Sequence, residues 1–206
     1  MQWQVRTASR WGRPVVLALL TGVVAQGCSS AAQAARQAEL PSTTVVLAGG
    51  CYWGVQSVFR HVRGIIADTA GYAVPAHGEA AEAVRLVYDS TRISYRQILG
   101  IFFSVVHDPT EVGRQGPDVG AEYRSVVFAG NDRQRSIAKA YIDSLSAAHS
   151  FPRPIVTEIT GLSAFHVVDQ SQQDYAEKHP TDAYIVTNDV PKIKALHQQL
   201  PALYKD

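Results

Sequence analysis

The sequence predicts an α/β protein: an α+β two-layer sandwich with a ferredoxin-like core, in which helices pack on a mainly antiparallel mixed sheet. Two observations lead to this fold class. Apolar, β-branched runs alternate with segments of helical periodicity in the order β-α-β-β-α-β-α-β. The stretch that carries this pattern is about 160 residues long, which is enough for one substantial core, and it contains no internal repeat.

The first half of the pattern contains three expected strands and two expected helices. The strands are apolar or β-branched runs at residues 43–48, 65–72 and 83–88. The helices, identified by their apolar spacing, are at residues 52–62 and 94–106. Ser94 is a suitable N-cap for the second helix. A proline, a histidine and a glycine predict a loop over residues 73–81.

The second half begins with a long polar segment, residues 107–122, which contains three glycines and two prolines. A loop of this length inside a compact domain is more often functional than accidental. Two further strands are expected at residues 123–129 and 155–159. Three further helices are expected at residues 132–148, 169–178 and 191–200, the first of them capped by Asn131 or Asp132.

The composition is that of one ordinary domain with a short extension. Of 206 residues, 46% are hydrophobic and 18% are charged, and the formal net charge is +1. No basic block lies beyond the N-terminal segment, so we expect no nucleic-acid partner. Met1 is the only methionine, which leaves the rest of the chain without an oxidisable thioether.

Residues 1–27 have the pattern of a signal peptide, because three arginines precede an apolar stretch that is too short to span a membrane. The segment Ala25-Gln26-Gly27-Cys28 resembles a bacterial lipobox, so Cys28 is a candidate lipid anchor; cleavage after Ala34 is the alternative. Residues 28–42 are rich in alanine, glutamine and serine and form an expected linker. We therefore expect an exported, periplasmic protein, anchored to the membrane if Cys28 is lipidated, with a folded domain at residues 43–206.

Cys51, the lone cysteine of this domain, is the most informative residue. Its surroundings, Gly49-Gly50-Cys51-Tyr52-Trp53-Gly54, follow an expected strand and precede an expected helix. The free N–H groups and the dipole at a helix start favour a thiolate, so we expect the pKa of Cys51 to be lowered from about 8.5 toward neutrality. Tyr52 and Trp53 would wall a pocket for a substrate with an apolar end. The alternative is a buried cysteine that only packs.

Candidate acids and hydrogen-bond donors lie in two other segments. Glu82 stands where a loop enters a strand, so burial is expected to raise its pKa and keep a proton available; a surface carboxylate is the alternative. Asp118 and Tyr123 could bring a carboxylate and a phenol into one cleft, or could serve loop capping and sheet packing. His107-Asp108 suggests a Cys-His-Asp arrangement, but a structural helix stop ranks above it. With one cysteine and no histidine pair at ligand spacing, no metal site is expected.

A series of short segments follows in a distinctive order: Gly50-Cys51-Tyr52-Trp53-Gly54, Gly71-Tyr72, Ala81-Glu82-Ala83-Val84, Ile93-Ser94-Tyr95, His107-Asp108-Pro109-Thr110, Arg114-Gln115-Gly116, and Asp118-Val119-Gly120 with Tyr123-Arg124-Ser125. In order and spacing they closely resemble the A-class peptide methionine sulfoxide reductases, over residues 43–200. Each motif alone is modest, but the ordered set is very specific.

The resemblance implies a site and a reaction. The family's nucleophile falls on Cys51, which attacks the sulfur of a methionine S-sulfoxide, and its acid falls on Glu82. Asp118 and Tyr123 match positions that line the oxygen site or support the cysteine, and Tyr52-Trp53 match the pocket for the substrate methyl group. The implied activity is peptide-methionine (S)-S-oxide reductase, acting on oxidised proteins or free methionine sulfoxide through a sulfenic acid on Cys51. No cofactor is implied beyond an external thiol reductant, such as a thioredoxin-like protein or a small thiol.

The sequence also departs from the family pattern. A longer loop before Ala-Glu-Ala-Val, with a tyrosine near the oxygen site, has no counterpart here, and Ala80, Ala121-Glu122 and Ser171-Gln172 replace the usual residues. The tail, residues 200–206, contains no resolving cysteine. A sulfenic acid on Cys51 must then be cleared by an external thiol, unless Cys28, which is within reach along the chain when it is not lipidated, takes that part. We predict a one-cysteine cycle in a monomer.

Two alternatives to this function remain open. One is another thiol enzyme that forms a sulfenic acid, for instance a peroxide reductase, which would need no aromatic methyl pocket. The other is a non-catalytic protein that binds oxidised methionine, suggested by the altered oxygen site.

Overall fold

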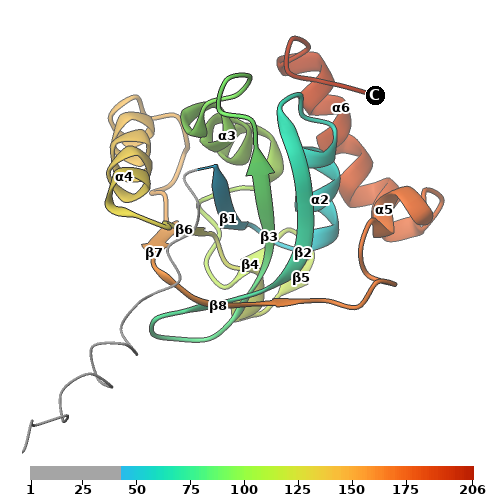
Figure 1. The fold of residues 1–206 in the computed structure, drawn as a ribbon, viewed down its shortest axis with the longest axis horizontal. Helices are drawn as coiled ribbons and strands as arrows, with labels where there is room; N and C mark the ends of the chain where they lie inside the picture. The colour runs from blue at the N-terminus through green and yellow to red at the C-terminus, as the bar shows by residue number, and fades with distance from the viewer. Residues whose placement is uncertain (1–42) are drawn as a thin grey trace, which may run out of the picture. The chain divides into compact units, whose positions relative to one another are not determined.

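The computed structural model describes residues 43–206 and contains a six-stranded mixed sheet (Figure 1). The strands are β1 (Thr44–Ala48), β2 (Ile65–Pro75), β3 (Ala81–Tyr88), β6 (Val126–Phe128), β7 (Glu158–Thr160) and β8 (Leu162–Val167). Their order across the sheet is β7-β6-β1-β3-β2-β8. All neighbouring pairs are antiparallel except β6 and β7, which are parallel. This mixed, mainly antiparallel sheet with packed helices confirms the predicted fold class.

The helices cover the sheet in the order α4, α3, α2 and α6 from left to right in Figure 1. The α-helices are α2 (Tyr52–Arg60), α3 (Tyr95–Ile101), α4 (Asp132–Ala147), α5 (Tyr175–Lys178) and α6 (Val190–Gln199). Two π-helical segments, η1 (Phe102–Val106) and η3 (Ile185–Asp189), adjoin α3 and α6. Ser94 caps α3 in a capping box with Gln97, and Asn131 caps α4, as the sequence predicts.

One face of the sheet forms the main core with the helices. Leu47 of β1 and Leu86 of β3 pack there with Phe59 of α2 and Ile98 of α3, and none of these side chains is exposed. The opposite face carries a smaller cluster that is rich in alanine and valine. Because side chains alternate along a strand, Glu82 shares the helix-covered face with Leu86. Glu82 is therefore on the same side of the sheet as the start of α2.

The prediction of a loop over residues 73–81 is wrong. β2 continues to Pro75 and β3 begins at Ala81, so the two strands form a hairpin whose turn is residues 76–80. Pro75 is accommodated because it is the last residue of β2, at an irregularity in the pairing with β8. Strand β8 itself has no counterpart among the predicted elements.

Other boundaries shift as well. The helix predicted at residues 94–106 changes from α to π at Phe102. Tyr123, predicted to begin a strand, ends a short 3-10 helix, η2 (Ala121–Tyr123). The strand predicted at residues 155–159 begins only at Glu158, as β7, because the pairing with β6 starts at that residue.

The long polar segment is folded rather than irregular. It forms a two-stranded hairpin of β4 (Arg114–Gln115) and β5 (Asp118–Val119), followed by η2. None of the helices described within residues 43–206 has the length and hydropathy needed to cross a bilayer. Residues 1–42, which carry the predicted signal peptide, linker and Cys28, lie outside the described residues.

Candidate active site

Cys51 is the N-cap residue of α2, at the end of a tight turn that follows β1. Gly50 in this turn has φ +91°, and a Cβ there would lie 2.7 Å from Cγ of Gln115. Glycine is therefore required both by the backbone conformation and by the approach of the β4–β5 hairpin. Gln115 is fixed by two hydrogen bonds with the backbone of Asp108, of 3.1 and 3.0 Å. The predicted strand–turn–helix setting of the cysteine is confirmed.

The predicted low pKa of Cys51 is wrong. The residue is only 8% exposed, and burial raises the pKa of its thiol far above the ordinary value. The negative charges of Glu82, Asp189 and Asp118 add to this increase, while a hydrogen bond from the backbone of Trp53 opposes it. The helix start does stabilise a thiolate, but burial among carboxylates outweighs it. The resting residue is therefore a thiol.

Glu82 is held next to Cys51 by the residue that follows it. The backbone N–H of Tyr52 donates to Oε2 of Glu82 over 3.1 Å, and the hydroxyl of Tyr72 lies 3.4 Å from Oε1. Glu82 is 6% exposed, and burial raises its pKa despite these two hydrogen bonds. The prediction of a buried carboxyl with a raised pKa is confirmed, so Glu82 can hold a proton near the thiol.

Asp118 and Tyr123 enter the same site from the β4–β5 hairpin and from η2. Burial, followed by the charges of Glu82, Asp118 and Cys51, raises the pKa of Tyr123 to about 12. Asp118 accepts a 2.5 Å hydrogen bond from the hydroxyl of Tyr184. The expected carboxylate and phenol are thus brought together with the thiol and the acid.

Four aromatic rings form a wall beside the cysteine. Trp53 stacks on Tyr175 with ring centres 3.9 Å apart, and Tyr184 meets it edge-on at 5.9 Å. Tyr52 contacts Trp53 edge-on at 6.2 Å. The indole N–H of Trp53 is buried and has no hydrogen-bond partner in the described structure. The two predicted wall residues are therefore joined by two tyrosines from the C-terminal third of the chain.

A buried ion pair lies against the first turn of α2. Asp189, at the end of η3, is completely buried, and Lys192 lies 3.3 Å from its Oδ1. Its other carboxyl oxygen has no partner in the described part of the chain. A Cβ on Gly54 would lie 2.8 Å from Nζ of Lys192 and 3.0 Å from Cγ of Asp189. Glycine at position 54 therefore lets this pair approach the helix that carries the cysteine.

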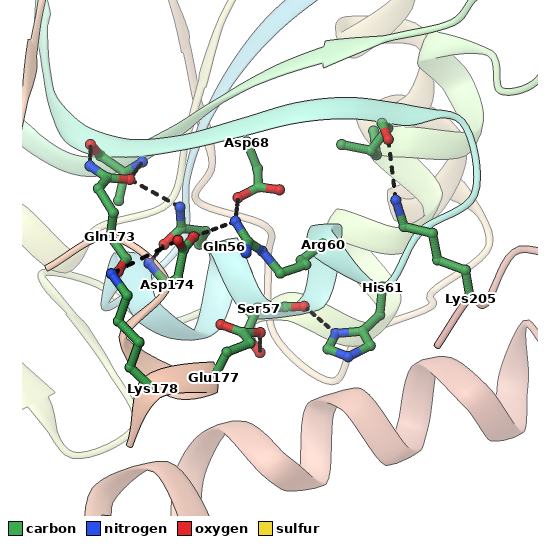
Figure 2. Close-up of polar contacts among 12 residues, drawn as sticks. Gln56, Ser57, Arg60, His61, Asp68, Gln173, Asp174, Glu177, Lys178 and Lys205 are labelled. Atoms are coloured by element: carbon green, nitrogen blue, oxygen red, sulfur yellow. Dashed lines mark hydrogen bonds and ion pairs between the residues drawn. The ribbon is translucent and has the colours of Figure 1, made fainter. Parts of the chain in front are cut away.

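A glutamine holds the segment that carries Tyr175 and Tyr184 (Figure 2). The side chain of Gln173 exchanges two hydrogen bonds with the backbone of Ala70, of 2.9 and 2.8 Å, much as a neighbouring strand would. It also accepts from Nε2 of Gln56 on α2 over 3.0 Å, and Oε1 of Gln56 accepts from the N–H of Asp174 over 2.9 Å. Arg60 adds ion pairs with Asp68 and Asp174. These directional bonds fix the aromatic wall relative to α2.

His107 has a structural role, as ranked from the sequence. Its Nδ1 donates to the carbonyl of Phe102 over 2.9 Å, and its Nε2 accepts from the hydroxyl of Ser125 over 2.6 Å. Both ring nitrogens are thus used away from Cys51. Asp108 turns back to Thr110 and pairs with Arg153, so the Cys-His-Asp arrangement is not formed.

Tyr72, Tyr175, Tyr184 and Asp189 were not among the predicted site residues. Tyr72 could have been found from the strand register, because it is the direct partner of Glu82 across the β2–β3 hairpin. Tyr175 lies in the helix expected at residues 169–178, and Tyr184 and Asp189 lie outside every expected element. Only long-range contacts bring these three side chains to the site.

A buried thiol, a buried carboxyl with a raised pKa and an aromatic wall on an α/β scaffold are the side chains expected of an enzyme that works through a cysteine thiol. Within residues 43–206, no group of His, Cys, Asp and Glu side chains could hold a metal ion.

The comparisons with known proteins identify the family. The family model described as peptide methionine sulfoxide reductase matches residues 43–203, and the chain belongs to this family. It is 44% identical over 177 residues to the peptide methionine sulfoxide reductase MsrA 2 of Mesorhizobium japonicum, covering 80% of this chain and 91% of the relative. The corresponding MsrA 2 of Synechocystis is 40% identical over 166 residues, covering 75% and 78%. The chain is thus an enzyme that reduces methionine sulfoxide.

Solved structures agree with this assignment. The crystal structure of reduced Mxr1 from Saccharomyces cerevisiae matches with a TM-score of 0.63 and 25% identity, covering 70% of this chain and 90% of that one. Methionine sulfoxide reductase A of Corynebacterium diphtheriae matches with a TM-score of 0.56 and 27% identity, covering 67% and 75%.

Proposed function

We propose that Cys51 is the nucleophile and Glu82 the acid in the reduction of methionine S-sulfoxide, free or within peptides. The observation that carries this proposal is the hydrogen bond from the N–H of Tyr52 to Glu82, which places a buried carboxyl with a raised pKa beside the thiol. A sulfoxide has an electron-rich oxygen and a sulfur that becomes electrophilic when that oxygen is protonated. An acid and a thiol side by side meet both requirements.

The chemical step balances without a cofactor. Glu82 gives its proton to the sulfoxide oxygen while the sulfur of Cys51 bonds to the substrate sulfur. The thiol proton of Cys51 replaces the proton that Glu82 has lost. The hydroxyl group of the adduct then passes to the sulfur of Cys51. This transfer breaks the sulfur–oxygen bond of the substrate and the bond between the two sulfurs, forms a sulfur–oxygen bond on Cys51, and leaves methionine and a sulfenic acid on Cys51. Because the resting cysteine is a thiol, this order keeps it unreactive until the polarised sulfoxide has bound.

The aromatic wall suits the apolar end of the substrate. Tyr52 and Trp53 bound the site next to Cys51, and Tyr175 and Tyr184 keep the indole ring in place. A methyl group against these rings would direct the sulfoxide oxygen toward Glu82, Asp118 and Tyr123. This orientation also provides the selectivity for the S epimer, since the opposite epimer would exchange methyl and oxygen.

An external thiol returns the enzyme to its starting state. One thiol displaces water from the sulfenic acid to form a mixed disulfide, and a second releases Cys51 as a thiol. Cys51 is free in the structure and is the single cysteine among residues 43–206. A thioredoxin-like protein or a small thiol is the class of reductant that this cycle requires.

One turnover on the separated R and S epimers, without reductant, tests this function. The full chain should convert one equivalent of the S epimer and gain one oxygen on Cys51 in mass spectra. Cys51→Ser should abolish conversion, and Glu82→Gln should lower the rate of sulfenic acid formation far more than it weakens binding. Unchanged turnover by Cys51→Ser would refute the assignment, a Cys28–Cys51 disulfide would refute the one-cysteine cycle, and oxidation by peroxide alone at equal rate would favour a peroxide reductase.

We also propose that repair takes place outside the cytoplasm, with residues 1–27 removed and Cys28 lipidated. The arginines, the apolar stretch and the small residues before Cys28 support this proposal. The mass of the mature protein and labelling with radioactive palmitate test it. An N-terminus at Met1 would refute export, and cleavage after Ala34 would refute lipidation.

A further inference from the structure

We propose that the hydroxyl group of Tyr72 is a hydrogen-bond donor that orients Glu82 and stabilises its carboxylate as it gives up its proton. Tyr72 is thus a positioning residue that acts through Glu82. This inference rests on the proposed role of Glu82 as the acid.

The strand register places Tyr72 next to the acid. Tyr72 of β2 and Glu82 of β3 are directly opposite each other, so their side chains lie on the same face of the sheet. The N–H of Tyr52 already occupies Oε2 of Glu82, at 3.1 Å. The proton of Glu82 therefore belongs on Oε1, and this is the oxygen that the Tyr72 hydroxyl approaches, at 3.4 Å.

The ring of Tyr52 packs against Tyr72 and limits its movement. The two rings meet edge-on, with centres 6.0 Å apart. Burial is the main cause that raises the pKa of both phenols, followed for each of them by the charge of Glu82. The hydroxyl of Tyr72 therefore keeps its proton and can donate a hydrogen bond to Glu82.

The donor at Oε1 favours proton release by Glu82. A hydrogen bond to a carboxyl oxygen strengthens as negative charge develops on it, so the long contact of the resting carboxyl becomes a charge-assisted bond in the transition state. The stabilisation applies to the chemical step more than to substrate binding.

The composition of the hairpin explains why this donor comes from β2. The turn, residues 76–80, reads Ala-His-Gly-Glu-Ala and contributes no hydroxyl group. β2 itself supplies the phenol beside Glu82.

Other charged groups also act on Glu82 and must be considered in any pH measurement. Asp118 of β5 and Glu122 of η2 raise its pKa through their negative charges. Cys51 and Tyr123 also interact with the carboxyl. All of these groups are unchanged in Tyr72→Phe, the variant that tests the donor.

The test is single-turnover formation of methionine from methionine S-sulfoxide by the full chain, across the pH range in which it stays folded. Tyr72→Phe should lower the maximal rate about tenfold with little change in KM, because a bond to a developing charge is lost. It should also move the fall in rate at alkaline pH to higher pH, because it removes a donor that lowers the pKa of Glu82. Tyr204→Phe, at the other end of α2, is the matched control and should behave like the wild type.

A Tyr72→Phe profile that superimposes on that of the wild type would refute the role of Tyr72. Glu82→Gln separates this inference from the proposed function. If Glu82→Gln retains the wild-type rate, the assignment of the acid is wrong. If it loses the rate while Tyr72→Phe does not, only the role of Tyr72 is wrong.

Discussion

Replacing Gly54 by alanine should destabilise the protein, although the same change usually stabilises a helix. Gly54 lies in the first turn of α2, three residues after Cys51. A Cβ there would lie 2.8 Å from Nζ of Lys192 and 3.0 Å from Cγ of Asp189, and closer still to Oδ1 of that residue. Because Asp189 is completely buried, its carboxyl group cannot turn toward solvent to make room.

The magnitude follows from two opposing effects. Alanine in place of glycine favours a helix interior by about 1 kcal/mol. Forcing an extra carbon into a closely packed site costs about 1–3 kcal/mol, and displacing a buried carboxylate from its only cationic partner adds to that cost. We therefore expect a net loss of about 1–2 kcal/mol, which lowers Tm by about 2–8 °C for a domain of this size.

The assay compares Gly54→Ala with Gly100→Ala in thermal unfolding. Gly100 also lies in a helix, but a Cβ there would meet only the hydroxyl of Tyr141, at 3.3 Å, at the end of a long side chain. Gly100→Ala should therefore leave Tm unchanged or raise it. Combining Gly54→Ala with Asp189→Ala should reduce the penalty, because the oxygen that clashes is removed. A rise in Tm for Gly54→Ala alone would refute the reasoning.

Three further results are expected. The pKa of His107 is lowered from 6.5 to about 4, mainly by burial, so the unfolded chain takes up a proton that the folded chain does not between these values; stability should therefore fall by on the order of 3 kcal/mol as the pH drops through this window. Urea midpoints against pH should show this slope in the wild type but not in His107→Gln, and equal slopes would contradict it. Because the pKa of Cys51 is raised, its reaction with iodoacetamide should be slow at neutral pH and should keep accelerating as the pH rises; a plateau near neutrality would contradict the buried thiol. Gln173→Leu should release the aromatic wall and shift the fluorescence of Trp53 to longer wavelength, measured after both N-terminal tryptophans are changed to phenylalanine, whereas Gln172→Leu should not.

The turn at Cys51 could be predicted from the sequence because it depends on local signals. A buried strand, adjacent glycines and helical spacing all occur within a few residues of each other. The pKa of the same cysteine could not be predicted in this way. The helix start is local, but the burial and the carboxyl groups that outweigh it come from β3, the β4–β5 hairpin and η3.

That Tyr72 and Glu82 share one face of the sheet could not be predicted from the sequence, for a different reason. Pro75, His77 and Gly78 indicate a loop, and the pairing that extends β2 to its last residue depends on β8, which lies almost ninety residues further along the chain. The positions of Tyr175 and Tyr184 likewise depend on the bonds of Gln173, which span more than one hundred residues. Local sequence patterns do not indicate contacts between residues so far apart along the chain.

The two π-helical segments constrain how this chain can change in length. η1 leads directly into His107, and η3 ends at Asp189, so each delivers a buried polar residue to the vicinity of the active site. A π-turn holds one residue more than an α-turn. Deleting one residue inside such a segment would restore an α-turn and leave the residues beyond it facing nearly the same way, whereas a deletion in a regular α-helical turn would rotate them by ~100° about the helix axis. His107 and Asp189 would therefore keep their present directions only when the deletion falls inside a π-turn. These two segments should accept a change of one residue in length that the adjoining turns of α3 do not.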